Sequence, residues 1–89
     1  MLNVAFDVDG TLQNYGEPNK PVITLFKEFE GLGCNMYIWS GEGVKHAEEW
    51  RDRLGLTATV VKKGSFVPDF AVDNVKGTKL GQVNIILTK

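Results

Sequence analysis

The sequence predicts an α/β protein with a mostly parallel sheet of about five strands. Short apolar or β-branched runs alternate with segments whose apolar residues recur at helical spacing, as in strands joined by right-handed helical crossovers. The first run, residues 2–6, is apolar on both faces, which is typical of a central strand in a sheet covered on both sides. We therefore expect a three-layer, Rossmann-like arrangement with this strand in the middle.

A first helix is expected to begin near Pro21, because proline is tolerated in the first turn of a helix. Apolar residues then recur at i, i+3, i+4, i+7 and i+10 and form one stripe for the core. This stripe consists of Val22, Leu25, Phe26, Phe29 and Leu32. Gly31 and Gly33 end the helix, and residues 34–39 form the second strand, which begins with Cys34 as a small buried filler.

A second helix is expected after Gly43, with Gly55 at its end. Its core face is predicted to carry Val44, Ala47, Trp50 and Leu54. His46 is expected on the outer side of this helix, where it takes no part in chemistry. Residues 57–61 form the third strand and residues 69–72 the fourth, which starts at a solvent-facing Asp69.

Residues 83–87 form a last strand, whose pairing the sequence leaves open. Residues 75–82 precede it and have little helical character, and they are fewer than a parallel crossover usually takes. We therefore expect this strand to pair antiparallel or to lie at an edge of the sheet. An exposed apolar edge is a template for another chain, so the sequence also predicts a possible homo-oligomer through this strand.

The composition fits one globular domain over residues 1–89. A net charge of −1 offers no field that would attract nucleic acids or anionic membranes in general. Cys34 is the single cysteine and cannot form an internal disulfide, and no apolar run approaches the ~20 residues that span a bilayer. We expect a cytoplasmic protein with no membrane partner.

The expected strands end in residues suited to metal or phosphate chemistry. Asp7 and Asp9 are two residues apart and so face the same spot beyond the first strand, where Gly10 lets the chain turn. The later strand ends supply Ser40, then Lys62 and Lys63, then Asp73. Parallel sheets bind ligands outside their carboxyl ends, and three carboxylates there stay ionised together only beside a cation, for which Mg²⁺ is the natural candidate.

This order of residues resembles the four motifs of the haloacid dehalogenase superfamily of phosphohydrolases, from about residue 2 to residue 74. Asp7-x-Asp9-Gly10-Thr11 is the most specific part. The resemblance implies a Mg²⁺-dependent phosphatase in which Asp7 attacks phosphorus to form an aspartyl-phosphate, while Asp9 acts as general acid and base. It implies that Asp7, Asp73 and the carbonyl group of Asp9 hold the metal. It also implies that phosphate is bound by Ser40, a lysine, and backbone N–H groups around Val8 and Gly41.

Three features depart from the pattern of that superfamily. Asn74 stands where many members carry a second acid, which lowers the negative charge of the site. The link between the third and fourth strands has lost its helix, yet residues 62–68 are long enough to cross the three strand spacings that the resemblance implies. No cap domain fits into the polar stretch 10–19, so this stretch is expected to be a flap over an open site that admits a phosphorylated small molecule or macromolecule.

Each residue also has a simpler interpretation. Ser40 would be the cap of the second helix, Asp73 a turn residue, and the Asp9-Gly10 pair a solvated turn at a strand end. Lys62 and Lys63 would be solvated loop charges. If one lysine serves the site, we favour Lys63, because it lies further beyond the strand end.

Two other functions remain open at this point. A binding or assembly module could keep the same fold and have weak or no turnover. A receiver-like signalling domain also phosphorylates an aspartate near Mg²⁺, but receivers place that aspartate after the third strand, where this chain has Val60-Val61-Lys62.

Overall fold

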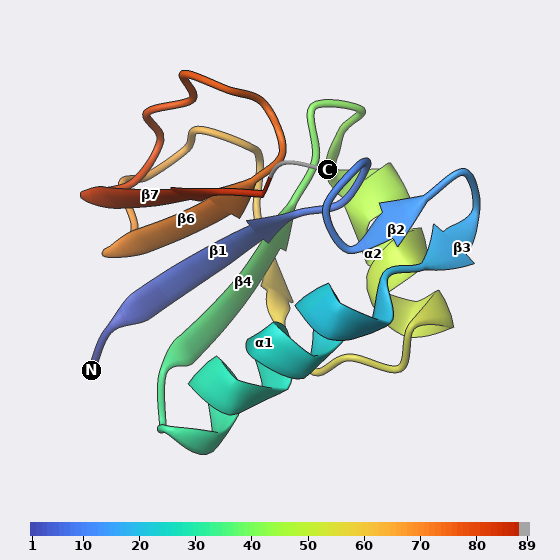
Figure 1. Ribbon diagram of the computed structural model, residues 1–89, viewed down its shortest axis with the longest axis horizontal. Coiled ribbons are helices and arrows are strands. Elements are labelled where there is room, and N and C mark those ends of the chain that lie inside the picture. Colours follow the sequence, from blue (N-terminus) through green and yellow to red (C-terminus); the bar gives the residue numbers. More distant parts are fainter. Residues whose placement is uncertain (88–89) are drawn as a thin grey trace.

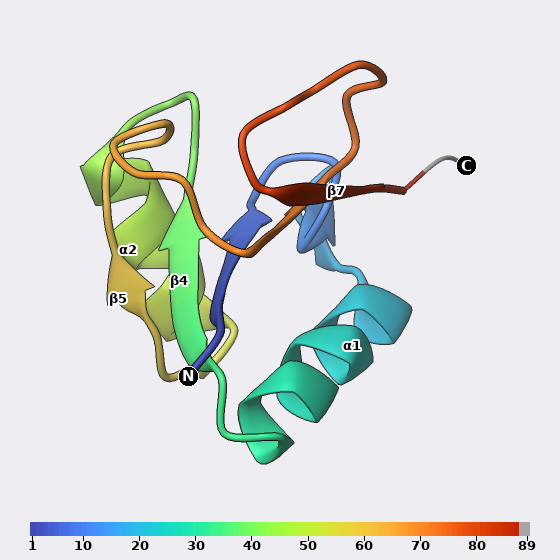
Figure 2. The same cartoon turned by 90° about the vertical axis from the view of Figure 1, so that its left-hand side faces the viewer.

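The computed structural model describes residues 1–87 and contains a five-stranded sheet with the order β5-β4-β1-β6-β7. All four strand pairs of this sheet are parallel, as Figures 1 and 2 show. Its strands are β1 (Asn3–Asp7), β4 (Asn35–Trp39), β5 (Thr59–Val60), β6 (Phe70–Asp73) and β7 (Val83–Ile86). The helices are α1 (Lys20–Gly31) and α2 (Val44–Arg53). The predicted α/β class and the predicted central position of the first strand are therefore confirmed.

Both helices pack on one face of the sheet. Phe6 from β1 contacts Phe26 from α1 edge to face, with ring centroids 5.2 Å apart. The buried cluster on this face also includes Val4, Val22, Met36, Ile38, Ala47, Trp50 and Val72. The connections from β1 to β4 and from β4 to β5 both move toward the same edge of the sheet. Two right-handed connections in one direction place their helices on the same face of the sheet.

The prediction of three layers is therefore wrong in one respect, because no helix covers the second face in residues 1–87. That face presents Ala5, Trp39 and Ala71, which pack against residues of two loops instead. Phe66, in the loop between β5 and β6, contacts Tyr37 and Trp39 with centroid distances of 4.8 and 5.8 Å. Figure 2 shows this loop passing across β4, and the loop spans the three strand spacings from β5 to β6 without a helix.

The last strand, β7, lies at the edge of the sheet, as predicted, but the alternative of antiparallel pairing is wrong. β7 pairs parallel with β6, from Phe70 opposite Val83 to Asp73 opposite Ile86. The short link before it is folded tightly: the Asn84 side chain accepts hydrogen bonds from the backbone N–H groups of Leu80 and Gly81, each at 2.9 Å. A Cβ atom on Gly81 would lie 2.8 Å from the backbone nitrogen of Ala71, so glycine lets this link lie directly on β6. A homo-oligomer through β7 stays a prediction.

The polar stretch after Gly10 contains a small hairpin that sequence periodicity did not reveal. β2 (Gln13–Asn14) and β3 (Glu17–Pro18) pair antiparallel, and Figure 1 shows them beyond the carboxyl end of β1. Their two-residue turn, Tyr15-Gly16, has positive φ at both positions, 51° and 82°, as a type I′ turn requires. The expected flap is thus a hairpin.

The structure corrects the predicted environments of several side chains. Leu32 and Val44, expected on core faces, are 80% and 40% exposed because each lies at or beyond a helix end. Asp69 does not simply face solvent, since its Oδ2 atom accepts a hydrogen bond of 2.7 Å from the backbone N–H of Asn3. Among residues 1–87, neither helix has the length and apolar character needed to cross a bilayer.

Candidate active site

The carboxyl ends of β1, β4 and β6 meet the loop after β5 at one edge of the sheet. Asp7, the last residue of β1, is 4% exposed and accepts a hydrogen bond of 3.2 Å from the hydroxyl group of Thr11. Asp73, the last residue of β6, is 1% exposed. β6 and β1 are neighbours in parallel register, so the two aspartates reach the same point from adjacent strands.

Lys63 joins these two aspartates. Its Nζ atom lies 3.0 Å from Oδ1 of Asp7 and 2.8 Å from Oδ2 of Asp73. Burial by itself would lower the pKa of Lys63, but the contacts with Asp73 and Asp7 outweigh it and raise that pKa above 10.5. Lys63 is therefore a fixed positive charge between two buried carboxylates, whereas Lys62 is exposed.

The pKa of Asp7 is raised above 3.8, chiefly because burial disfavours the carboxylate. The nearby charge of Asp73 raises this pKa further, while the hydrogen bonds from Lys63 and Thr11 lower it. The hydrogen bond from Lys63 therefore does not fully offset the cost of burying the Asp7 carboxylate. One lysine also balances the charge of only one of the two carboxylates that it contacts.

Asn74 places its amide where three oxygen atoms converge. Oriented so that the amide nitrogen donates, it lies 3.2 Å from Oδ2 of Asp7, 3.2 Å from Oδ1 of Asp73 and 3.1 Å from the carbonyl oxygen of Asp9. Oδ1 of Asp73 also accepts the backbone N–H groups of Asn74 and Val75, at 2.7 and 3.0 Å. Oδ2 of Asp73 is buried, and its partner among residues 1–87 is the ammonium group of Lys63, at 2.8 Å.

These oxygen atoms form a set that could hold a hard cation. In the described part of the chain, no three His, Cys, Asp or Glu side chains gather into a metal-binding group. The set here is instead two carboxylates and one backbone carbonyl, from Asp7, Asp73 and Asp9, and Mg²⁺ accepts such ligands together with water. A hydrogen-bond donor at the meeting point of three acceptor oxygen atoms marks a position that suits a cation.

Gly10 makes room for Asn74, which gives a test of this arrangement. Gly10 has φ of +80°, and a Cβ atom there would overlap the Asn74 side chain, with Cγ at 2.6 Å. Gly16 has nearly the same φ, +82°, but nothing within 4 Å of its Cβ position. We expect Gly16→Ala to cost about 1–2 kcal/mol from backbone strain alone. Gly10→Ala should cost at least about 1 kcal/mol more, because it also displaces the amide.

Urea denaturation of both variants measures this difference. Equal losses of unfolding free energy for Gly10→Ala and Gly16→Ala would show that Asn74 does not occupy the position described.

Asp9 lies beside this cluster and is held by three side chains. Gln13 Nε2 donates to its Oδ1 atom at 2.6 Å, and Ser40 Oγ donates to its Oδ2 atom at 3.3 Å. His46 Nε2 lies 3.0 Å from both oxygen atoms. The expectation that His46 stays on the outside of its helix is therefore wrong.

Helical geometry explains the error about His46. Ala47 and Trp50 are the buried residues of α2, and His46 lies one turn before Trp50, on the same side of the helix. The predicted core face includes Val44, which is 40% exposed, and leaves out His46. The sequence motif includes Thr11 but gives it no role, and nothing in the sequence indicated Gln13 or the hairpin that positions it.

Ser40 is 3% exposed at the end of β4, and its hydroxyl oxygen accepts the backbone N–H of Glu42 at 3.0 Å. It is not the cap of the second helix, because α2 begins later, at Val44, with Gly43 as its N-cap residue. Val8 is fully buried, and Gly41 is exposed in the turn after Ser40. The structure thus brings Asp7, Lys63, Asp73 and Asn74 into direct contact, with Asp9 and Ser40 joined to each other alongside.

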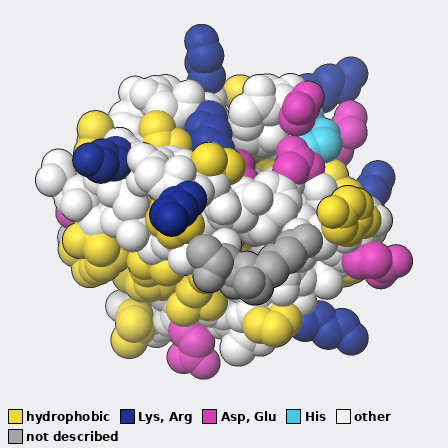
Figure 3. All heavy atoms as spheres, turned by 45° about the horizontal axis from the view of Figure 1, so that its top comes forward, with side chains coloured by type: hydrophobic (Ala, Val, Ile, Leu, Met, Phe, Trp, Pro, Cys, Tyr) yellow, Lys and Arg dark blue, Asp and Glu magenta, His cyan; other side chains and the backbone are white. Residues whose placement is uncertain are grey.

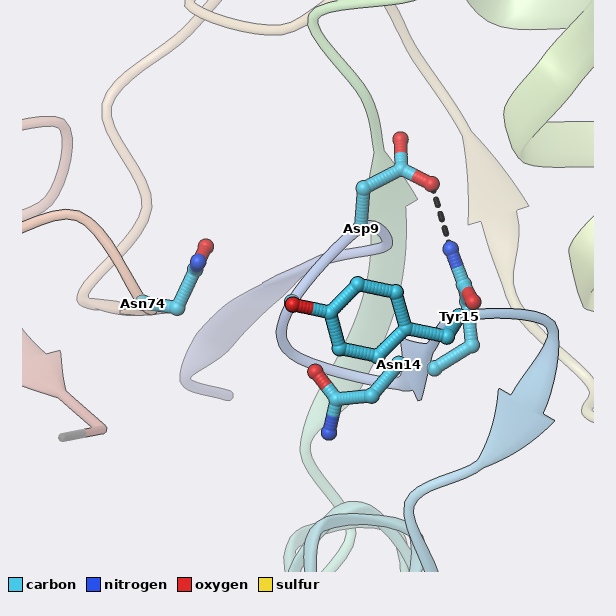
Figure 4. Close-up of a pocket in the computed structure, with 6 residues that line it drawn as sticks. Asp9, Asn14, Tyr15 and Asn74 are labelled. Carbon is cyan, nitrogen blue, oxygen red and sulfur yellow. Dashed lines mark hydrogen bonds between the residues drawn. The ribbon is translucent and has the colours of Figure 1, made fainter. Parts of the chain in front are cut away.

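A pocket of about 470 Å³ opens next to this cluster. It is lined by Asp9, Gly10, Gln13, Asn14, Tyr15 and Asn74. Figure 4 shows Asp9 on one side of the pocket and Asn74 on another, with the ring of Tyr15 below Asp9 in this view. In the space-filling view of Figure 3, acidic, basic and histidine side chains all reach the surface on this side of the molecule.

The chain was compared with known proteins in three ways. No protein-family model matches it, and neither the curated proteins nor the solved structures contain a match.

Proposed function

We propose that this protein is a Mg²⁺-dependent phosphohydrolase that cleaves phosphomonoesters through an aspartyl-phosphate on Asp7. The observation that carries the proposal is that Lys63 joins two buried carboxylates, Asp7 and Asp73, at the edge of a parallel sheet. A merely structural ion pair needs one carboxylate, whereas two carboxylates and one lysine leave negative charge for a cation. The resemblance of the motifs to the haloacid dehalogenase superfamily supports the same reaction.

The residues present fit a Mg²⁺ ion. Asp7, Asp73 and the carbonyl group of Asp9 would hold it, since their oxygen atoms already converge on the amide of Asn74. When bound, the ion would offset the negative charge of the phosphoryl group. Asn74 would move its amide away from this point or turn it so that its oxygen faces the cation.

The first half of the reaction requires a nucleophile and an acid. A carboxylate oxygen of Asp7 forms a bond to phosphorus as the bond from phosphorus to the ester oxygen breaks. Asp9 gives its proton to the departing oxygen, so the alcohol leaves neutral. Lys63 stays beside Asp7 and balances the charge that builds up on the phosphoryl oxygens, and Ser40 can donate a hydrogen bond to one of them.

The second half reverses the role of Asp9. The carboxylate of Asp9 takes a proton from water as the water oxygen attacks phosphorus, and the acyl-phosphate bond to Asp7 breaks. Inorganic phosphate leaves and both aspartates return to their initial state. His46 and Gln13 contact Asp9 but not Asp7 in the described structure, so they are positioning residues that set where this carboxyl group lies.

Hydrolysis of a generic aryl phosphate tests the proposal. We expect the purified protein to release phosphate from 4-nitrophenyl phosphate in the presence of Mg²⁺ and to lose this activity when EDTA removes the metal. Activity should return when Mg²⁺ is added in excess, and Ca²⁺ should not replace it, because Ca²⁺ prefers more ligands at longer distances.

The outcomes of this assay separate a phosphohydrolase from a binding module. A folded protein that binds phosphate in the presence of Mg²⁺ but hydrolyses none of a broad phosphomonoester panel would be a binding module. Hydrolysis that is unchanged by EDTA would contradict the metal-dependent mechanism.

A further inference from the structure

The turn of the hairpin carries an aromatic residue in a conformation that costs free energy. Tyr15 has φ of 51°, and it is the only residue other than glycine with a positive φ in the described part of the chain. Type I′ turns favour asparagine or glycine at this position, whereas a bulky side chain is strained there. The Tyr15 side chain is not needed for the core, because the residue is 94% exposed. A strained and exposed aromatic residue is more typical of a binding site than of a structural turn.

The turn is fixed relative to the residue proposed as the acid. The side chain of Gln13 donates to Asp9 at 2.6 Å and accepts the backbone N–H of Gly16 at 2.8 Å. The Gln13 side chain therefore links Asp9 to the turn through two hydrogen bonds. Tyr15 lines the same pocket as Asp9 (Figure 4).

The pocket is where a leaving group would lie. In the proposed function, on which this inference rests, Asp9 protonates the departing oxygen, so the rest of the substrate must extend from Asp9. The pocket beside Asp9 has a volume of about 470 Å³, enough for a ring system. None of the described residues that line it is lysine or arginine, so a second phosphate group there would meet Asp9 without a counter-charge.

We propose that the ring of Tyr15 forms one wall of a leaving-group site, and that the preferred substrates are phosphomonoesters whose alcohol carries a neutral, flat aromatic group. A tyrosine ring stacks on nucleobases and on benzene rings alike, because both present a π-face. The shared chemistry is therefore the planar ring, and the two sources, a nucleoside and an aryl alcohol, are separated by experiment.

Two substrate pairs test this inference. Adenosine 5′-monophosphate and ribose 5-phosphate both present a ribose 5-phosphate ester but differ in the base, and benzyl phosphate and ethyl phosphate differ in the ring. We expect wild-type kcat/KM to be about tenfold higher for the aromatic member of at least one pair, which is the effect of about 1.4 kcal/mol of stacking. The pair that shows the preference identifies the source of the ring.

Three variants of Tyr15 separate a binding role from a structural one. Tyr15→Phe keeps the ring and should keep the preference. Tyr15→Leu should lose it, so that kcat/KM becomes about equal for the aromatic and the non-aromatic member of that pair. Tyr15→Asn introduces the residue that the turn favours, so it should unfold at a higher urea concentration than the wild type and still lose the preference.

Failure of the inference about Tyr15 and failure of the proposed function would give different results. Loss of activity on all four substrates in Tyr15→Asn, or equal kcat/KM for both members of each pair in the wild type, would overturn this inference while leaving phosphohydrolase activity intact. Absence of hydrolysis of every substrate by the wild type would instead overturn the proposed function, and this inference with it.

Discussion

Asp7→Asn is expected to abolish phosphate release, with a loss of at least about a thousandfold in kcat, because the amide cannot form the acyl-phosphate bond. The substitution keeps the size of the side chain and lets it still accept a hydrogen bond from Lys63, so the fold should persist. Phosphate release at saturating Mg²⁺ measures the effect. Retention of more than about a tenth of the wild-type rate would contradict the assignment of Asp7 as nucleophile.

The stability of Asp7→Asn relative to the wild type should increase as the pH rises. In the folded protein the pKa of Asp7 is raised above 3.8. At a pH between 3.8 and this higher pKa, the unfolded wild-type chain therefore binds fewer protons than the folded protein. The unfolding free energy of the wild type consequently falls as the pH increases through this window. The amide side chain of the Asp7→Asn variant does not ionise, so the variant escapes this loss. The unfolding free energy of Asp7→Asn minus that of the wild type should therefore increase as the pH is raised through this window.

An exposed aspartate provides the control for the loss of activity. The side chain of Asp52 is 70% exposed and pairs with Arg51 at the surface, so Asp52→Asn should leave the activity close to that of the wild type. If Asp52→Asn also reduced turnover strongly, the loss in Asp7→Asn could not be ascribed to the nucleophile.

Lys63→Met is expected to lower the unfolding free energy at neutral pH by about 3 kcal/mol, because it leaves two buried carboxylates without their positive partner. We place the effect at the lower end of the range for broken buried pairs, since the lysine side chain is itself 23% exposed. Denaturation in urea at pH 7 measures the loss. At acid pH the difference in unfolding free energy from the wild type should narrow, because the pKa of Asp7 is raised and protonation neutralises its carboxylate.

Lys62 supplies the matched control for this variant. It is the preceding residue in the chain and is exposed, so Lys62→Met should change the unfolding free energy by less than about 0.5 kcal/mol. Mg²⁺ should stabilise Lys63→Met more than it stabilises the wild type, because the unpaired carboxylates attract the cation more strongly. Equal stabilities of the two lysine variants would contradict the ion-pair cluster, and an absence of extra Mg²⁺ stabilisation would contradict the cation site.

The sheet could be predicted because its strands are short and apolar and are separated by clear helical patterns. β1 is buried over Val4, Ala5 and Phe6, and this central position follows from its lack of a polar face. The parallel pairing of β7 could not be predicted, because it depends on how Asn84 and Gly81 fold the link onto β6. Such contacts are made in three dimensions and leave no periodic pattern.

The candidate site was predictable where it is built from strand ends. Asp7 and Asp73 end two strands and Lys63 follows a third, and the carboxyl ends of parallel strands lie at one edge of the sheet, so these residues were expected on the same edge. His46 was not predictable in this way, because its role depends on the exact rotation of α2 against the sheet. The hairpin that carries Tyr15 was missed because β2 and β3 contain two residues each, too few for any periodicity.

A crystal structure with beryllium fluoride and Mg²⁺ tests the central claim most directly, because this compound forms a stable mimic of an acyl-phosphate on a reactive aspartate. We predict density bonded to a carboxylate oxygen of Asp7, a metal ion between Asp7, Asp73 and the carbonyl group of Asp9, and Lys63 in contact with the fluoride ligands. Well-ordered crystals in which Asp7 carries no adduct and Asn74 still occupies the meeting point of the three oxygen atoms would contradict the claim.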